Sequence, residues 1–122
     1  MCEKILVVED HADTREILST LLQFEGWNVI KAEDGLEGLE MAESQHPDLI
    51  LTDINMPRLN GINFITRLRT NPDFADVPIV ALTAYGQIMK DEAIDAGANR
   101  VMDKPIEFDA FINVVKEICN PH

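Results

Sequence analysis

Short, nearly continuous apolar runs alternate along this chain with longer segments in which apolar residues recur every three or four positions. Apolar runs of this length are typical of strands buried on both faces of a parallel sheet. The segments between them have the period of an amphipathic helix. The alternation predicts strands at residues 5–8, 29–32, 49–52, 79–82 and, more weakly, 100–102.

The helical segments carry their own start and stop signals. Asp13 or Thr14 is suited to cap the start of the first helix, and Gly26 suits the left-handed position after its end. The other helices are predicted at residues 36–44, 62–69, 88–96 and 108–118. Because right-handed crossovers place helices on both faces of such a sheet, the chain predicts a flavodoxin-like α/β fold with a doubly wound, five-stranded parallel sheet and five helices.

Length and charge limit what the domain can do. The 122 residues suit one domain spanning 1–122, and no linker, repeat or low-complexity segment divides them. The formal net charge is -12, from 22 acidic and 10 basic residues. A field of that sign repels nucleic acids and anionic lipids, so we expect neither direct nucleic-acid binding nor membrane association.

Two cysteines lie near opposite ends of the sequence. Cys2 and Cys119 lack the CxxC spacing of redox or metal sites, and the chain has neither an 18-residue apolar run nor the pattern of a signal peptide. These features predict a reduced, cytoplasmic protein whose cysteines are inert.

Polar residues stand where the predicted strands end. Glu9 and Asp10 follow the first strand, Asp53 the third, Thr83 the fourth and Lys104 the fifth. Ligands bind outside the carboxyl ends of the strands in such sheets, so these side chains should converge. Three neighbouring carboxylates repel one another and call for a cation, and Mg²⁺, with Mn²⁺ as a possible substitute, prefers oxygen ligands shared with phosphate. The pattern predicts a phosphoryl-transfer site.

These residues and their neighbours resemble the receiver domain of response regulators over essentially the whole chain, in particular the single-domain chemotaxis type. The resemblance implies the strand order 2-1-3-4-5 and rests on four elements in the expected order: Glu9-Asp10, Asp53-Ile54-Asn55-Met56-Pro57 with Gly61, Thr83-Ala84, and Lys104-Pro105.

The resemblance also implies a role for each matched residue. Asp53 is the phosphoacceptor, Glu9 and Asp10 hold Mg²⁺ directly or through water, Asn55 offers its main-chain carbonyl to the metal, and Thr83 and Lys104 contact the phosphoryl group. The Lys104–Pro105 peptide bond is expected to be cis, and Gly61 to provide room before the next helix.

A stand-alone response regulator of two-component signalling is the function that the resemblance implies. A sensor histidine kinase or a histidine phosphotransfer protein would supply the phosphoryl group. Phosphorylation would then change binding to a downstream protein through the fourth helix, fifth strand and fifth helix. The chain would be an enzyme only toward itself, in gaining and losing its phosphoryl group. A phosphorelay shuttle that passes the group to a histidine phosphotransfer domain is the alternative role.

Three positions near the site depart from the family pattern or add to it. Val101 stands where receivers commonly carry a switching aromatic residue, and its stiff side chain has no ring to swing. Tyr85, two residues after Thr83, could shield the acyl phosphate from water. A loop histidine beside a hard-cation site is typically solvated, so His11 is not expected to bind the metal.

Two unrelated functions are compatible with the same fold class. An FMN-binding electron carrier needs a glycine- and hydroxyl-rich loop after the first strand, where this chain has acidic residues. A phosphatase of the haloacid-dehalogenase type also forms an aspartyl phosphate, but it needs a second acid two residues after the nucleophile, where this chain has Asn55. Phe64, Phe108 and Phe111 are expected in the core.

Overall fold

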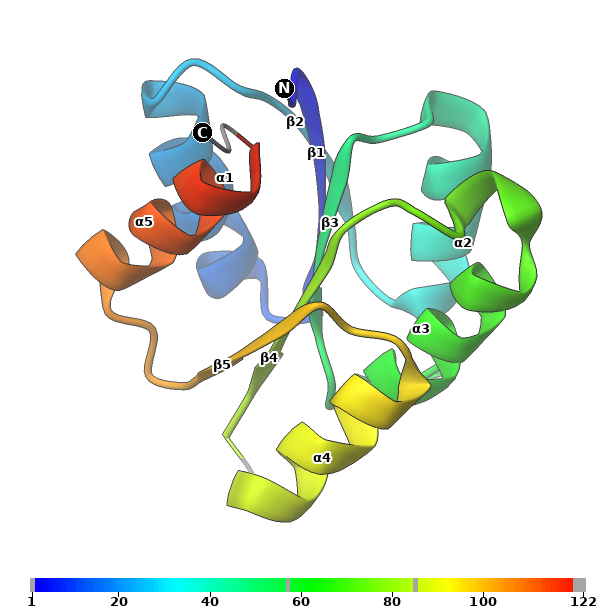
Figure 1. Cartoon of the computed structure of the whole chain (residues 1–122). Coiled ribbons are helices and arrows are strands. Elements are labelled where there is room, and N and C mark those ends of the chain that lie inside the picture. The colour runs from blue at the N-terminus through cyan, green and yellow to red at the C-terminus, as the bar shows by residue number, and fades with distance from the viewer. Residues whose placement is uncertain (1, 57, 85, 120–122) are drawn as a thin grey trace.

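In a computed structural model, residues 2–56, 58–84 and 86–119 are described. They form five parallel strands in the order β2-β1-β3-β4-β5, alternating with five helices (Figure 1), which confirms the predicted flavodoxin-like α/β fold and strand order. The strands are β1 Lys4–Val8, β2 Asn28–Ala32, β3 Leu49–Asp53, β4 Ile79–Thr83 and β5 Arg100–Asp103. The helices are α1 Ala12–Phe24, α2 Gly35–Gln45, α3 Gly61–Thr70, α4 Gly86–Ala96 and α5 Phe108–Cys119.

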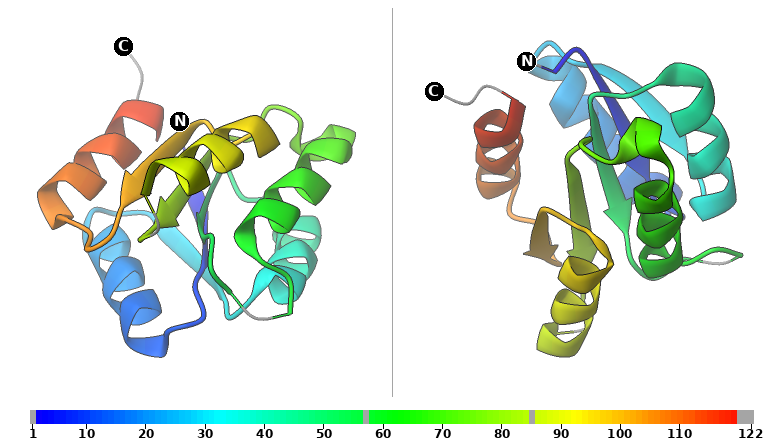
Figure 2. Two further views of the ribbon diagram at one scale, coloured as in Figure 1. Left: turned by 90° about the horizontal axis from the view of Figure 1, so that it is seen from below. Right: turned by 45° about the vertical axis from the view of Figure 1, so that its right-hand side comes forward.

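Helices cover both faces of the sheet. Figures 1 and 2 show α1 and α5 on one side and α2, α3 and α4 on the other. Successive residues of a strand point to opposite faces, so Ile5 packs in the layer of α1 and α5 whereas Leu6 packs in the layer of α2, α3 and α4. Phe64 and Phe111 are fully buried on opposite sides, as expected for core residues.

Some sequence-based expectations about α1 and α5 are wrong. The N-cap of α1 is His11, not Asp13 or Thr14, because the helical hydrogen bonds begin two to three residues earlier, with the Arg15 amide donating to the His11 carbonyl. Phe108 is 49 % exposed rather than part of the core. It is the first residue of α5 and lines an open groove together with Ile17 and Ile106.

Arg69 joins three segments on the α3 side of the sheet. Its guanidinium donates to the carbonyls of Phe74 at 2.6 Å and Val77 at 2.8 Å, and to Asn99 Oδ1 at 2.9 Å. Its Nε donates to the Gly97 carbonyl at 3.0 Å. This single side chain therefore ties α3 to the unpredicted 3₁₀ turn Pro72–Phe74, to the approach to β4 and to the α4–β5 connection.

The two ends of the described chain are covalently joined. Cys2 and Cys119 form a disulfide with their Cα atoms 4.9 Å apart, so the prediction of free, inert cysteines is wrong. Their separation of 117 residues in sequence gave no sign of this proximity. It arises because α5 runs back along the sheet and ends beside the start of β1. No helix in the described part of the chain is long and apolar enough to cross a membrane.

Candidate functional site

The parallel strands bring their carboxyl ends to one edge of the sheet. Asp53 is the last residue of β3 and pairs in register with Leu82, and Thr83 ends β4 opposite Asp103. The site side chains of Glu9, Asp53 and Thr83 come directly from these strand ends or from the next residue, and all three residues are buried. The sheet therefore supplies a rigid base for the site.

Lys104 connects two of the carboxylates. Its Nζ donates to Glu9 Oε1 at 2.9 Å and forms an ion pair with Asp53 Oδ2 at 3.1 Å. The lysine follows β5 directly, and its peptide bond to Pro105 is cis. One ammonium group thus partly neutralises two buried acids from two other strands.

The buried charges shift one another's protonation. Burial, followed by repulsion from Glu9, raises the pKa of Asp53 to about 6, although Lys104 opposes the shift. Burial also acts to raise the pKa of Glu9, but the hydrogen bonds from Lys104 and the His11 backbone N–H outweigh it, and that pKa is lowered. Burial acts to lower the pKa of Lys104, but its two carboxylate partners outweigh it and raise that pKa, so the lysine stays protonated.

Asp10 provides the open position of the site. Its Oδ1 atom is buried and has no hydrogen-bond partner among the described residues. Burial and the neighbouring Glu9 carboxyl raise the pKa of Asp10. Single ligand atoms of Glu9, Asp10, His11 and Asp53 all lie within 4.8 Å of one another. A buried carboxylate oxygen without a hydrogen bond, 3.4 Å from His11 Nδ1 and beside two further carboxylates, fits a divalent cation with oxygen ligands.

The loop after β3 folds back over Asp53. The Asn55 backbone N–H donates to Asp53 Oδ1 at 3.3 Å. A Cβ atom on Gly61 would lie 2.3 Å from the Asp53 carbonyl oxygen and 2.6 Å from Ile54 Cα, so the expected need for room at Gly61 is confirmed. Arg58, in the left-handed region with φ 67°, forms an ion pair with Asp34, the N-cap of α2.

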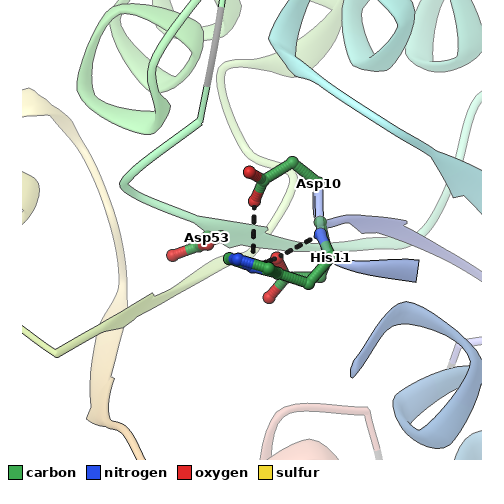
Figure 3. Close-up of side chains that lie close together, drawn as sticks. Asp10, His11 and Asp53 are labelled. Carbon is green, nitrogen blue, oxygen red and sulfur yellow. Dashed lines mark hydrogen bonds and ion pairs between the residues drawn. The ribbon is translucent and has the colours of Figure 1, made fainter. Parts of the chain in front are cut away.

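Of the remaining predicted positions, some lie among the described residues and others do not. Val101 lies in β5, partly buried against the core beneath α2, α3 and α4. Tyr85 and Pro57 lie outside the described residues. His11 is 70 % exposed, as expected of a solvated residue, yet its Nδ1 lies 3.4 Å from Asp10 Oδ1 (Figure 3), and it lies 3.2 Å from Glu9 Oε2. The sequence did not predict these two contacts. The place of His11 directly after the acidic pair was the available signal.

Comparison with known proteins agrees with the fold and with the acidic site. Residues 5–116 match the response regulator receiver domain family, and the chain therefore belongs to this family, which serves two-component signalling.

Two curated relatives illustrate the range of lengths in the family. The chain is 40 % identical over 113 residues to the response regulator MprA of Mycobacterium ulcerans, covering 92 % of this chain but only 48 % of MprA. It is 31 % identical over 117 residues to the polar-differentiation response regulator DivK of Brucella ovis, covering 95 % of each chain. The chain thus spans about half of one relative and nearly all of the other.

Solved structures agree closely in three dimensions. The chemotaxis response regulator CheY4 of Vibrio cholerae matches with a TM-score of 0.90 at 29 % identity, covering 97 % of this chain and 99 % of that one. The receiver domain of the sensor histidine kinase PA1611 from Pseudomonas aeruginosa matches with a TM-score of 0.89 at 29 % identity, covering 98 % and 100 %. The latter structure has a magnesium ion coordinated in its active site cleft.

Proposed function

We propose that this chain is a response regulator receiver that accepts a phosphoryl group on Asp53 and thereby changes its affinity for a partner protein. The observation that carries the proposal is the position of Lys104 Nζ, 2.9 Å from Glu9 Oε1 and 3.1 Å from Asp53 Oδ2. The Lys104 ammonium group thus lies beside the buried carboxylate of Asp53 at the end of the central strand β3. That is the arrangement that phosphoryl transfer to an aspartate requires.

The reaction is a displacement at phosphorus. An oxygen of the Asp53 carboxylate attacks the phosphorus of a phosphohistidine on a sensor histidine kinase or a histidine phosphotransfer protein. The new O–P bond forms as the P–N bond breaks, and the donor histidine leaves as an imidazole that takes up a proton. Lys104 and the Thr83 hydroxyl stabilise the charge on the transferred group. Attack by water on the same phosphorus later regenerates Asp53.

A divalent cation completes the site, and the carboxylates fit Mg²⁺. Asp10 and Asp53 would bind it directly, the Asn55 main-chain carbonyl would add a further ligand, and Glu9 would act through water because Lys104 already occupies Oε1. The ion supplies positive charge to the phosphoryl oxygens in the transition state. The orphaned Asp10 Oδ1 supports this ligand set.

The phosphodonor protein must approach the edge of the sheet that bears Asp53. A groove lined in part by Ile17, Lys104, Ile106 and Phe108 opens between α1 and the segment after β5. Ile17 and Phe108 are 47 % and 49 % exposed. Because Lys104 belongs both to the groove and to the site, a donor seated there would bring its histidine to Asp53.

The output surface proposed on α4, β5 and α5 includes Ile88, which is 74 % exposed.

Intact-mass measurement tests the chemistry. The purified protein is incubated with acetyl phosphate, with Mg²⁺ or with a chelator, and the expected product is one added phosphoryl group only when Mg²⁺ is present. Asp53→Asn should abolish the addition, whereas the matched surface variant Asp13→Asn should retain it. Labelling of Asp53→Asn to the wild-type extent would show that another group accepts the phosphoryl.

A second measurement separates the switch from the relay. Phosphorylated protein is mixed with candidate histidine phosphotransfer domains, and loss of the phosphoryl group from Asp53 is followed with time. A switch keeps its intrinsic rate of loss in every mixture. Rapid transfer to one of the domains would establish the shuttle role instead.

A further inference from the structure

The backbone directs the His11 side chain back over the acidic cluster. The His11 N–H donates to Glu9 Oε2 at 3.1 Å, which curls residues 9–11 around that carboxylate. His11 is also the N-cap of α1, but its side chain makes no capping hydrogen bond. The imidazole is therefore not used to stabilise the helix, and Figure 3 shows the ring lying beside Asp10 with its nitrogen directed into the cluster.

The distance from His11 Nδ1 to the Asp10 carboxylate is close to that between neighbouring ligands in a coordination shell, whereas its contact with Glu9 Oε2 is a hydrogen bond. Nδ1 lies 3.2 Å from Glu9 Oε2 and 3.4 Å from Asp10 Oδ1. Adjacent ligands of an octahedral ion with bonds of about 2.1 Å lie about 3.0 Å apart. Because the lone pairs of Nδ1 and of a carboxylate oxygen repel each other at this distance, a positive charge must lie between the two atoms. That charge is either a proton on Nδ1 or a metal ion. The Asp10 oxygen that faces Nδ1 is the buried atom without a hydrogen bond.

We propose that His11 Nδ1 is a direct ligand of the metal centre and gives this chain selectivity for a first-row transition-metal ion over Mg²⁺. The inference rests on the proposed function in assuming that the carboxylates of Asp10 and Asp53 hold a divalent cation. It assigns to His11 a role in the choice of that cation.

The selectivity follows from ligand chemistry. Mg²⁺ prefers oxygen ligands and gains little from an imidazole, whereas Co²⁺, Ni²⁺ and Zn²⁺ form stronger bonds to imidazole nitrogen. Any carboxylate site binds Co²⁺ more tightly than Mg²⁺, so the contribution of His11 lies in how far its removal changes the ratio of the two affinities. Its 70 % exposure leaves the ring free to rotate toward an incoming ion without disturbing the core.

Calorimetric titration with Co²⁺ and, separately, with Mg²⁺ tests the proposal. The titrations are done at about pH 8, where a free imidazole is neutral and able to bind metal. His11→Ala should weaken Co²⁺ binding about tenfold or more and change Mg²⁺ binding less than about twofold. The visible absorption of bound Co²⁺ should lose its nitrogen-ligand contribution in the same variant. Circular dichroism checks that this exposed substitution leaves the fold intact.

Two controls distinguish the possible failures. His46→Asn removes a histidine at the end of α2, where φ is 50° and asparagine is tolerated, and should leave both affinities unchanged. Asp10→Asn should abolish tight binding of both ions. Equal losses for Co²⁺ and Mg²⁺ in His11→Ala, or no loss for either, would overturn the role of His11 alone. Mg²⁺ binding that persists in Asp10→Asn would overturn the metal site of the proposed function.

Discussion

Asp53 sits in surroundings that disfavour its charged form. Its side chain is buried, Glu9 repels its charge, and its pKa is raised to about 6. A shift from 3.8 to about 6 corresponds to an unfavourable contribution of about 3 kcal/mol when the group is ionised. The ionised Asp53 carboxylate therefore lowers the stability of the fold, and a bound cation would offset this loss.

Replacing Asp53 with a neutral side chain of the same shape should stabilise the metal-free protein. We expect Asp53→Asn to raise the free energy of unfolding at neutral pH by about 1 to 3 kcal/mol in the presence of a chelator. Urea unfolding measures the change. Added Mg²⁺ should stabilise the wild type but not the variant. Asp13→Asn, on the exposed surface of α1, is the control and should leave stability within about 0.5 kcal/mol.

The same raised pKa predicts a pH dependence with a definite sign. Between about pH 4 and pH 6 the folded state holds a proton on Asp53 that the unfolded state has released, so the stabilising effect of protonation is lost as pH rises. The difference in unfolding free energy between wild type and Asp53→Asn isolates this residue from the other acids. Without metal, the wild type should become less stable relative to Asp53→Asn as the pH rises across that range. Above it, the difference in unfolding free energy should stay constant. A difference that stays flat with pH would contradict the raised pKa.

At the scale of elements, Arg69 holds together segments that the sheet does not connect directly. Its side chain donates to three backbone carbonyls at 3.0 Å or less, and to Asn99 Oδ1, which also accepts from the Ile79 amide at 2.8 Å. Asn99 thus links the arginine to the start of β4. The positions of α3, β4 and the α4–β5 connection depend on one planar guanidinium.

Arg69→Lys should destabilise the domain even though the substitution keeps the positive charge. An ammonium group cannot reach the same set of carbonyls in a fixed fork, so partly buried acceptors lose their donors. We expect a loss of about 2 to 3 kcal/mol in urea unfolding. Arg67→Lys, on an exposed position of the same helix, should cost less than about 0.5 kcal/mol. Similar losses in both variants would mean that the contacts of Arg69 contribute nothing specific.

The elements were predictable from sequence where the signal is local. Apolar runs gave β3 and β4 nearly to the residue, and the polar residue after each run gave the side chains of the site, because parallel strands end at a common edge. The start of α1 was misplaced because Asp13 and Thr14 are typical capping residues, whereas the observed N-cap, His11, makes no side-chain capping hydrogen bond. The contacts of Arg69 were missed because most of its acceptors are backbone carbonyls. Every residue has a backbone carbonyl, so the residue types in the sequence do not indicate which of them accept a hydrogen bond.

The disulfide and the orientation of His11 were missed for a different reason. Both depend on where separate parts of the chain meet in three dimensions. Cys2 and Cys119 become neighbours only after four crossover connections and the final helix α5 have brought the chain back to the start of β1. The His11 ring joins the cluster through a backbone turn around Glu9, which residue types alone do not specify.

For the whole molecule, oxidation of the cysteine pair should be a large contribution to stability. Closing a loop with a sequence separation of 117 residues restricts the unfolded chain and is expected to contribute about 3 to 5 kcal/mol. Thermal unfolding with and without a thiol reductant measures it. The reductant should lower the midpoint of the wild type and leave a Cys2→Ser, Cys119→Ser double variant unchanged. Equal midpoints of the wild type in both conditions would show that the bond does not stabilise the fold.

The same bond determines how the molecule would bear a mechanical load. Cys2 precedes β1 and is bonded to Cys119 at the end of α5, near the amino-terminal ends of the strands, whereas Asp53 ends β3 at the carboxyl-terminal ends. A tension applied through residues at these two ends would pass through the sulfur atoms, and the strands would carry almost none of it. In a single-molecule pulling experiment, the oxidised domain should stay closed under forces that extend the reduced one, with the strand ends that bear Asp53 facing away from the tether.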